Sequence, residues 1–215
     1  MAYTYEHPHP AVTVDVAVFT ITAGRLAVVL VRRAAWPHAG KWALPGGFVG
    51  IDESLKRAAF RELREETGLR AGYLEQLGAF GRPDRDPRER VVTVVYIALA
   101  SAERIELQAG SDAKEARLFR LDELPELAFD HARIVRLAAG RLRERLDTEG
   151  VARRLMPQRF TLTELQQACE AVAGTHFDKR NFRKKLTTLE LLEPTGEARS
   201  DGPQRPARLY RVKPQ

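Results

Sequence analysis

One stretch of the sequence constrains this chain more than any other. Residues 46–69 read GGFVGIDESLKRAAFRELREETGL, and their second half has the periodicity of a helix. At about 100° per residue, Leu55 and Ala59 lie on one face of that helix, and Glu62 and Glu66 continue the same face. Carboxylates at this spacing repel each other by about a few tenths of a kcal/mol. The face that should pack inward therefore ends in negative charge.

Two interpretations of this charged face are open. Glu65 lies beside the other glutamates, whereas Arg57, Arg61 and Arg64 are predicted to point the other way. A solvated acidic face is one interpretation, with an ion pair between Arg61 and Glu65. The inward direction favours another, because an ionised carboxylate facing a protein body is costly unless a cation compensates it. Mg²⁺ supplies such compensation and bridges carboxylates to substrate phosphates, so the pattern predicts a metal site at the end of a packing helix.

The order of apolar runs predicts an α/β domain around this helix. Strands are expected at residues 11–21, 25–33, 73–80, 91–100 and 115–121, and helices at 54–67 and 129–146. Mixed strands with two flanking helices are typical of one α/β domain. We assign it residues 1–148, followed by a linker at 149–158, where Pro157 would break a continuing helix, and a second domain at 159–215.

The composition excludes several other classes of protein. Cys169 is the only cysteine in 215 residues, so no intrachain disulfide is possible, which fits a reducing cytoplasm. One cysteine and five histidines disfavour a structural zinc site, so any metal would be held by oxygen ligands. The longest apolar run, 91–100, is too short for a bilayer, which needs about 20 residues. The first ten residues lack the pattern of a signal peptide. We expect a cytoplasmic protein with no membrane partner.

The last part of the chain is basic and helical. Residues 157–215 hold 11 lysines and arginines against 7 acidic residues, and so carry most of the formal net charge of +6. A helix is expected at 161–173, a turn at Gly174 and a second helix at 178–192, followed by two short strand-like pieces.

The second of these helices separates apolar from basic side chains. Phe182, Leu186 and Leu189 share a core-facing side. The opposite side is basic and polar, with Arg180, Arg183, Lys184 and Thr187. This is the helix-turn-helix layout, whose second helix enters the major groove of DNA. The strand-like pieces would form a wing with three arginines near phosphates, namely Arg199, Arg205 and Arg208. An interaction or dimerisation module with a solvated basic face is the alternative.

The spacing of the first motif identifies a family. Gly47, five residues, Glu53, seven residues and then 61–69 match every fixed position of the Nudix box, so the chain resembles the Nudix family. The resemblance implies an α/β/α sandwich with a mixed sheet and hydrolysis of nucleoside diphosphates linked to another group. It implies that Mg²⁺ or Mn²⁺ is held by Glu62, Glu65, Glu66 and the carbonyl of Gly46. The implied catalytic set adds Glu53 and Arg61 as positioning residues, while the metals orient the attacking water.

Two further segments suggest the nucleotide. FGRPDRDPRERVVTVVYIAL (80–99) and LAFDHARIV (127–135) are similar to segments of Nudix proteins that handle ADP-ribose. We predict that the pyrophosphate is bound by arginines through bidentate hydrogen bonds. The substrate-binding candidates are Arg33, Arg82, Arg85, Arg88, Arg90 and His131. Alternatively, the loop arginines only offset Asp84, Asp86 and Glu89, and His131 has a capping or structural role. The aromatic residues Trp36, Trp42 and Phe48 are expected to pack in the core or in loops, and stacking on an adenine is the alternative.

The tail has a family resemblance of its own. RFTLTELQQACEAVAGTHFDKRNFRKKLTTLELLEPTG followed by RPARLYR is similar to the winged helix domain of Nudix-related transcriptional regulators of NAD metabolism. The resemblance implies a homodimer that binds ADP-ribose and a double-stranded DNA operator. The DNA-binding candidates are Lys179, Arg180, Asn181, Arg183, Lys184, Thr187 and the three wing arginines.

One departure from that family bears on activity. Many such regulators carry an eroded Nudix box and only sense the nucleotide, whereas this box is intact. Our first hypothesis is an ADP-ribose-responsive DNA-binding regulator that also hydrolyses ADP-ribose to AMP and ribose 5-phosphate. The alternative is a Mg²⁺-dependent ADP-ribose pyrophosphatase whose C-terminal domain serves dimerisation or protein contacts.

Overall fold

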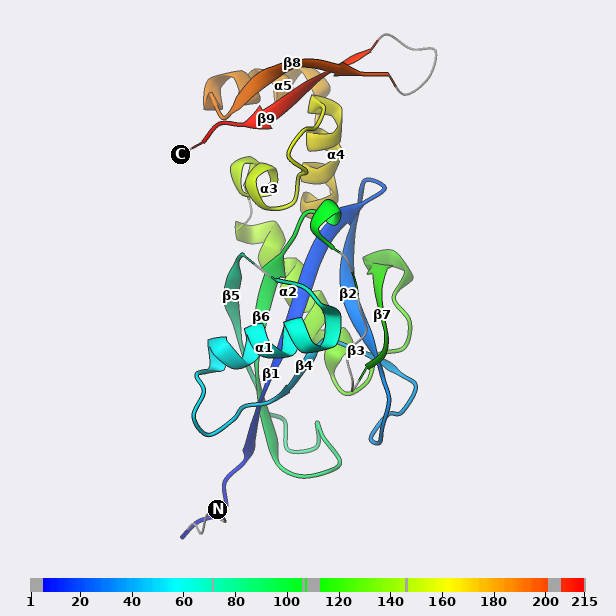
Figure 1. The fold of residues 1–215 in the computed structure, drawn as a ribbon, viewed down its shortest axis with the longest axis vertical. Helices are drawn as coiled ribbons and strands as arrows, with labels where there is room; N and C mark the ends of the chain where they lie inside the picture. The colour runs from blue at the N-terminus through cyan, green and yellow to red at the C-terminus, as the bar shows by residue number, and fades with distance from the viewer. Residues whose placement is uncertain are drawn as a thin grey trace.

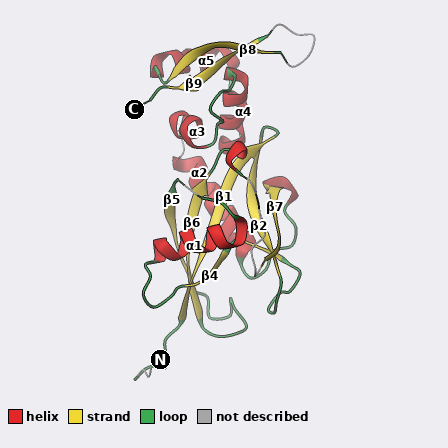
Figure 2. Ribbon diagram, in the orientation of Figure 1, coloured by secondary structure: helices red, strands yellow, loops and turns green. Residues whose placement is uncertain are grey.

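The computed structural model describes residues 6–70, 72–105, 107, 113–145, 147–200 and 206–214. Figures 1 and 2 show a larger α/β part and, beyond it, a smaller part of helices and one hairpin. The strands are β1 (Ala11–Thr22), β2 (Arg25–Arg33), β3 (Trp42–Ala43), β4 (Gly46–Phe48), β5 (Leu74–Phe80), β6 (Val91–Leu99), β7 (Ala113–Arg120), β8 (Leu192–Arg199) and β9 (Ala207–Val212). The helices are α1 (Leu55–Thr67), α2 (His131–Arg145), α3 (Thr148–Arg154), α4 (Leu162–Ala173) and α5 (Lys179–Leu189), with short 3₁₀ turns at Ala102–Arg104 and Leu121–Glu123.

The larger part is built around β1 in a mixed sheet. The strand order is β3-β2-β1-β6-β5, with β4 paired to β1 and β7 paired to β2. β1 runs parallel to β6 and antiparallel to β2 and β4. Alternate residues of β1 face opposite sides of this sheet. Val14 and Val16 pack with Ala59 of α1 on one side, whereas Phe19 packs with Ile134 of α2 on the other. The result is an α/β/α arrangement.

Helix α1 forms where the sequence predicts it. Its N-cap Ser54 accepts a hydrogen bond from the backbone N–H of Arg57, which satisfies one of the free donors of the first turn. Gly68 ends the helix with φ 75°, a left-handed conformation that glycine adopts without strain. Ala58 and Leu63 are fully buried against the sheet. The helix is therefore held firmly at the point where its glutamates begin.

The smaller part begins inside the segment that we assign to the linker. Residues 148–154 form α3, whose Val151 and Ala152 are buried, and Leu155 follows them into the core. Asp147 caps this helix by accepting from the backbone N–H of Gly150. The polar composition hid this helix, since only a few of its residues are apolar. The domain boundaries themselves stay a prediction.

Helices α4 and α5 form the predicted pair. Thr161 and Glu164 make a capping box at the start of α4, and Gly174 ends it in a left-handed conformation. The second helix ends at Leu189, three residues before the predicted end at Leu192. Its C-cap is Glu190, at φ 47°, and the next residues turn into β8, which pairs with β9. The expected length was wrong because Leu191 and Leu192 belong to the turn into β8 and to the strand itself, and not to the helix.

The two parts share one apolar core. The larger cluster of buried side chains runs from Phe19 and Ile134 through Leu155 to Leu165 and Phe182. Helix α4 contacts both β2 and α2. Within the residues that the structure describes, no helix is long and apolar enough to cross a membrane.

Candidate functional sites

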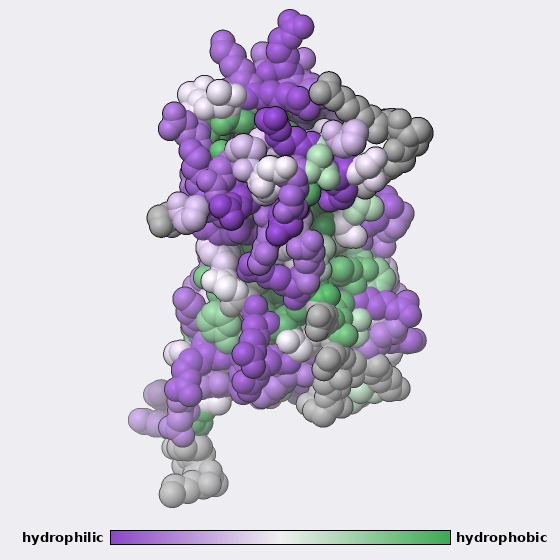
Figure 3. Space-filling view, turned by 45° about the horizontal axis from the view of Figure 1, so that its top comes forward, coloured by the Kyte–Doolittle hydropathy of each residue, from purple (hydrophilic) through white to green (hydrophobic). Residues whose placement is uncertain are grey.

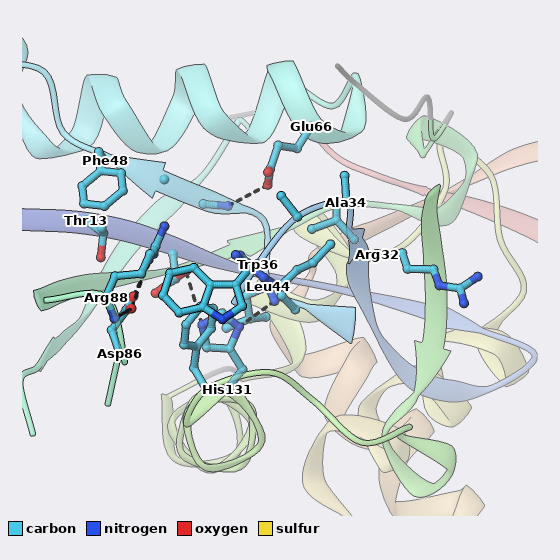
Figure 4. A pocket seen from close by; sticks show the side chains of 18 of the residues that line it. Thr13, Arg32, Ala34, Trp36, Leu44, Phe48, Glu66, Asp86, Arg88 and His131 are labelled. Carbon is cyan, nitrogen blue, oxygen red and sulfur yellow. Dashed lines mark hydrogen bonds and ion pairs between the residues drawn. The ribbon is translucent and has the colours of Figure 1, made fainter. Parts of the chain in front are cut away.

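The last two turns of α1 lie against the glycines of β4. The backbone N–H of Gly46 donates to Glu66 Oε2 at 2.9 Å. A Cβ atom at position 47 would lie 2.4 Å from Glu62 Oε1, so only glycine lets the carboxylate approach this closely. Figure 4 shows Glu66 pointing from α1 toward the strands below it. Helix and loop thus bring two carboxylates onto one short strand, as the sequence predicts.

Burial makes these two carboxylates hard to ionise. Burial raises the pKa of Glu66 to about 7, and the neighbouring charges of Glu62 and Asp15 act in the same direction. Burial also raises the pKa of Glu62, whose side chain is 12% exposed. A cation bound beside the two carboxylates would favour their ionised form.

Arg61 does not point away with Arg57 and Arg64, and that prediction was wrong. Its guanidinium donates to Glu53 Oε2 at 3.1 Å, to Glu62 Oε1 at 2.6 Å and to Glu65 Oε2 at 3.1 Å. The long side chain bends back along the helix surface, which a wheel based on Cα positions does not reveal. Hydrogen bonding to Arg61 lowers the pKa of Glu53 to about 2. Arg61 thus ties the loop before α1 to the glutamates at its end.

The residues around β4 fit a hard divalent cation by their chemistry. The side chains of Glu62, Glu65 and Glu66 offer a metal carboxylate oxygens, the ligand atoms that Mg²⁺ and Mn²⁺ prefer. Among the described residues, however, no three acidic, histidine or cysteine side chains converge on one point. The reason is that Glu65 turns to Arg61, whereas Glu66 turns to the N–H of Gly46. Glu62, Glu65 and Glu66 as ligands stay a prediction, as does the carbonyl of Gly46.

A pocket of about 400 Å³ opens beside Glu66 (Figure 4). It is bounded by β4, the loop after β2, the loop before β6 and the start of α2. Its floor is the buried Asp15, which accepts a hydrogen bond from Thr93 Oγ1 at 2.6 Å. Asp15 also lies 3.8 Å from Arg85 and 3.5 Å from His131. The floor is a polar network within the sheet.

His131 belongs to this network through both ring nitrogens. Its Nδ1 accepts a hydrogen bond from the backbone N–H of Leu44 at 2.9 Å, which places the proton on Nε2, toward Asp15. Burial lowers its pKa, so the ring is neutral at physiological pH. The bond from Leu44 fits a structural role, while ligand binding by His131, which lines the pocket, stays a prediction.

Three of the five candidate arginines line the pocket. Arg85 is buried, binds Asp130 at 2.8 Å and leaves its Nε without a partner among the described residues. Arg88 binds Asp86 and lies over the ring of Phe48, 5.1 Å from its centroid. Arg33 lies 4.8 Å from the ring centroid of Phe129.

Arg85 and Arg88 form ion pairs with Asp130 and Asp86, whereas Arg33 forms none among the described residues. The pKa of Arg33 is lowered, first by burial and then by the nearby charge of Arg88. Two guanidinium groups that repel each other in one pocket favour an anionic ligand.

The other two arginines lie outside the pocket lining. Arg82 forms an ion pair with Asp84 at 2.7 Å, and both side chains are exposed. Arg90 donates to the backbone carbonyl of Arg82. For Arg82 the contacts match the alternative interpretation, a charge offset on a solvated loop.

Several pocket residues were absent from the predicted set, among them Asp15, Phe129 and Trp36. Asp15 had a detectable signal, since it is an acidic residue inside an apolar strand run, TVDVAV. Phe129 lies within LAFDHARIV, the same segment that led us to His131. Trp36 was expected to pack, but its side chain is 69% exposed and lines the pocket, and Phe48 is 43% exposed. Only Trp42 packs as expected, edge-on against Phe119.

A second candidate site is the outer face of α5. Phe182 and Leu186 are buried, as predicted, whereas Leu189 is 42% exposed. The candidates on the opposite face are all exposed: Lys179, Arg180, Asn181, Arg183, Lys184 and Thr187. Within the described chain, none of the four basic residues among them forms an ion pair. Figure 3 shows hydrophilic residues over most of this end of the molecule. Such an uncompensated basic face suits a polyanion.

The three wing arginines differ from one another. Arg208 is exposed on β9. Arg199 contacts Glu164 of the α4 capping box, so one of its roles is to hold the hairpin to the helix. Arg205 lies outside the described residues.

Two family models match the chain, one after the other. A model described as the NUDIX domain matches residues 11–138, and one described as the NrtR DNA-binding winged helix domain matches residues 152–212. Fold and matches together define a protein with a Nudix domain followed by a winged helix domain, which confirms the predicted fold class.

Individual relatives share both domains. The "ADPR responsive transcriptional repressor NtrR" of Acinetobacter baylyi is 38% identical over 210 residues, which cover 96% of this chain and 83% of the relative. The crystal structure of Shewanella oneidensis NrtR complexed with a 27mer DNA has a TM-score of 0.80 at 36% identity, over 94% of this chain and 93% of that one. The "ADP-ribose pyrophosphatase" of Methanocaldococcus jannaschii is 44% identical over 128 residues, 60% of this chain and 72% of the relative. The chain therefore belongs to the Nudix family and, within it, to the NrtR-type regulators.

Proposed function

We propose that this protein is a DNA-binding transcriptional regulator of NAD metabolism whose Nudix domain binds ADP-ribose. The observation that carries the proposal is the coexistence of two sites in one chain with one core. One site is a pocket lined by Arg33, Arg85 and Arg88, of which Arg33 forms no ion pair among the described residues, and the other is an exposed basic helix. Relatives that respond to ADP-ribose and bind DNA support the assignment of a ligand to each site.

In the pocket, the arginines bind the pyrophosphate. Arg33 and Arg88 lie on aromatic rings that orient their guanidinium planes, and they supply the positive charge. Arg85, which lines the pocket and is paired with Asp130, adds positive charge to its wall. Asp15 and His131 hold the floor in place through Leu44.

On DNA, α5 enters the major groove of each half-site. Lys179, Arg180, Arg183 and Lys184 lie near phosphates, whereas Asn181 and Thr187 face base edges. Each phosphate contact is independent of sequence and weakens with salt. A homodimer presents two such helices to two half-sites, which matches the two-fold symmetry of an operator.

ADP-ribose changes operator affinity because one helix, α2, extends from the nucleotide pocket to the winged helix domain. Helix α2 begins at His131 beside the pocket, and Arg143 near its end lies about 3.5 Å from where a Cβ would be on Gly174, the residue between α4 and α5. A ligand alters DNA binding only if it binds two arrangements of the protein with different affinity. Helix α2 reaches from the pocket to the turn between α4 and α5 and is the element through which that difference acts.

The same Nudix domain also hydrolyses its ligand. Nudix hydrolases generally use divalent metals, and here Glu62, Glu65 and Glu66 would hold Mg²⁺ or Mn²⁺ with the carbonyl of Gly46. The metal supplies charge neutralisation at the pyrophosphate and orientation of the attacking water. Arg61 and Glu53 position the helix end against the loop. The products are AMP and ribose 5-phosphate, and their release removes the signal.

The proposal is tested by measuring DNA affinity and turnover in one preparation. Duplexes selected from a random pool serve as operators, and their affinity for the protein is measured by fluorescence anisotropy with and without ADP-ribose. We expect specific binding that ADP-ribose changes. AMP is followed by chromatography after addition of Mg²⁺. A chain that binds no DNA even at low salt would contradict the regulatory function, whereas a chain that binds DNA but releases no AMP would contradict only the hydrolytic one.

A further inference from the structure

The indole of Trp36 is the most exposed large apolar side chain at the nucleotide pocket. It is 69% exposed, although indole rings usually bury most of their surface. Within the described part of the chain, it makes no hydrogen bond, ring stacking or cation–π contact. It nevertheless lines the pocket that holds Arg33 and Arg88 (Figure 4). An apolar surface left in water at a binding site requires an explanation.

The backbone that carries Trp36 is anchored on both sides. Arg33 Nε donates to the carbonyl of Pro37 at 2.7 Å, and the backbone N–H of Gly40 donates to the carbonyl of Arg33 at 2.9 Å. The ring of His38 meets the ring of Phe129 edge-on at 4.8 Å. A fixed loop thus presents a free ring, so a planar ligand that covers the ring loses little loop entropy on binding.

The other aromatic rings of the pocket already have partners. Phe48 and Phe129 lie beneath the guanidinium groups of Arg88 and Arg33. The pocket therefore has a cationic part, where rings support arginines, and one ring with an open face. This division matches a ligand with an anionic centre and a planar, uncharged end.

We propose that Trp36 forms the stacking surface for the nucleobase of the bound nucleotide, which is adenine in ADP-ribose. This inference rests on the proposed function, because it assumes that the pyrophosphate lies at Arg33 and Arg88. Stacking is tolerant of base identity, since every base has a π face. Trp36 therefore contributes affinity for nucleotides that carry a base, and discriminates them from sugar phosphates that lack one.

The first test compares ADP-ribose with ribose 5-phosphate by isothermal titration calorimetry, in the absence of divalent cations so that neither is turned over. For Trp36→Ala we expect a Kd for ADP-ribose that is roughly 5- to 150-fold higher, the range for loss of one stacked base. Trp36→Phe keeps an aromatic face and restores most of the affinity. The Kd of ribose 5-phosphate should be unchanged in both variants. Trp42→Phe is the matched control, because Trp42 packs on Phe119 outside the pocket lining.

A second readout uses the two tryptophans of the chain. In Trp42→Phe the fluorescence comes from Trp36 alone, and ADP-ribose should quench it because the base covers the ring. In Trp36→Phe, the remaining Trp42 signal should not respond.

The outcomes separate the two proposals. If the wild-type chain binds ADP-ribose and Trp36→Ala binds it equally well, the stacking assignment is wrong while the proposed function stands. The same holds if Trp36→Ala changes only the oligomeric state, because the ring would then be covered by a second copy of the chain. If the wild-type chain does not bind ADP-ribose, the proposed function fails and the stacking role fails with it.

Discussion

Helices α1 and α5 both gather charge of one sign on one face, yet they place it differently. In α1, the charges of Glu62 and Glu66 lie against a glycine strand, where burial raises both pKa values. In α5, charged side chains such as those of Arg183 and Lys184 are exposed to solvent. A buried cluster of charged side chains has room only for a compact counterion such as a metal ion, whereas an exposed row of charged side chains can contact an extended polyanion such as DNA. The burial of the charged groups therefore distinguishes the metal site from the DNA-binding face more clearly than the sign of their charge does.

The two helices also differ in whether their charged side chains have partners within the protein. Arg61 on α1 contacts three glutamates and so neutralises part of their charge within the protein. The basic residues of α5 have no such internal partner among the described residues, because acidic side chains are absent from the helix between Asp178 and Glu190. The first helix is partly compensated before any ligand binds. The second depends on its ligand for compensation.

The largest effect is expected from Glu65→Gln. The change removes a charge from the acidic cluster, so we expect metal affinity to fall and AMP release from ADP-ribose to drop by about 100-fold or more. Glu65 is half exposed, so the melting temperature without metal should stay within about 1 °C. Chromatography of AMP, metal titration and thermal melting measure the three quantities. Full Mg²⁺-dependent turnover in this variant would remove Glu65 from the metal site.

A smaller effect is expected from pH, through Glu66. Its pKa is about 7 in the folded chain and near the ordinary 4.5 when unfolded, so the folded state holds an extra proton between these values. The free energy of unfolding should therefore fall as pH rises from about 5 to about 8, by up to about 3 kcal/mol. Urea unfolding without divalent cations measures this.

Glu66→Gln is the control for that experiment, since it cannot ionise. The free energy of unfolding of this variant should decrease less over the same pH range than that of the wild-type chain. Mg²⁺ binds the ionised form, so adding it should restore stability to the wild-type chain at the higher pH. Equal pH dependence in wild type and variant would refute the buried-carboxylate description of α1.

The smallest effect is expected on the other helix, from Arg183→Ala combined with Lys184→Ala. Both side chains are exposed, so stability should change by less than about 0.5 kcal/mol. DNA affinity at moderate salt should fall about tenfold, and the slope of log affinity against log salt should become shallower by about 2. Anisotropy titrations over a salt series measure both. Arg82→Ala, a surface arginine paired with Asp84, is the matched control and should leave DNA binding unchanged.

Sequence reasoning found the elements and the acidic cluster because both follow from local pattern. Ser54, Gly68 and the glutamate spacing define α1 without knowledge of the rest of the chain. It failed for Arg61, whose direction depends on a flexible side chain. It also missed Asp15 and the exposure of Trp36, because the pocket is assembled from β1, the loop after β2 and the start of α2, which meet only in the folded chain.

The continuous core described above also bears on how this architecture is inherited. Side chains of α4 such as Leu165 belong to the same buried cluster as Phe19 and Ile134 of the Nudix part. A different winged helix joined at the same point would have to reproduce that apolar surface. Substitutions on either side of the junction are therefore expected to be correlated through evolution. We therefore expect the two domains to change in concert at this junction, while the loops around Trp36 and the outer face of α5 are free to change independently.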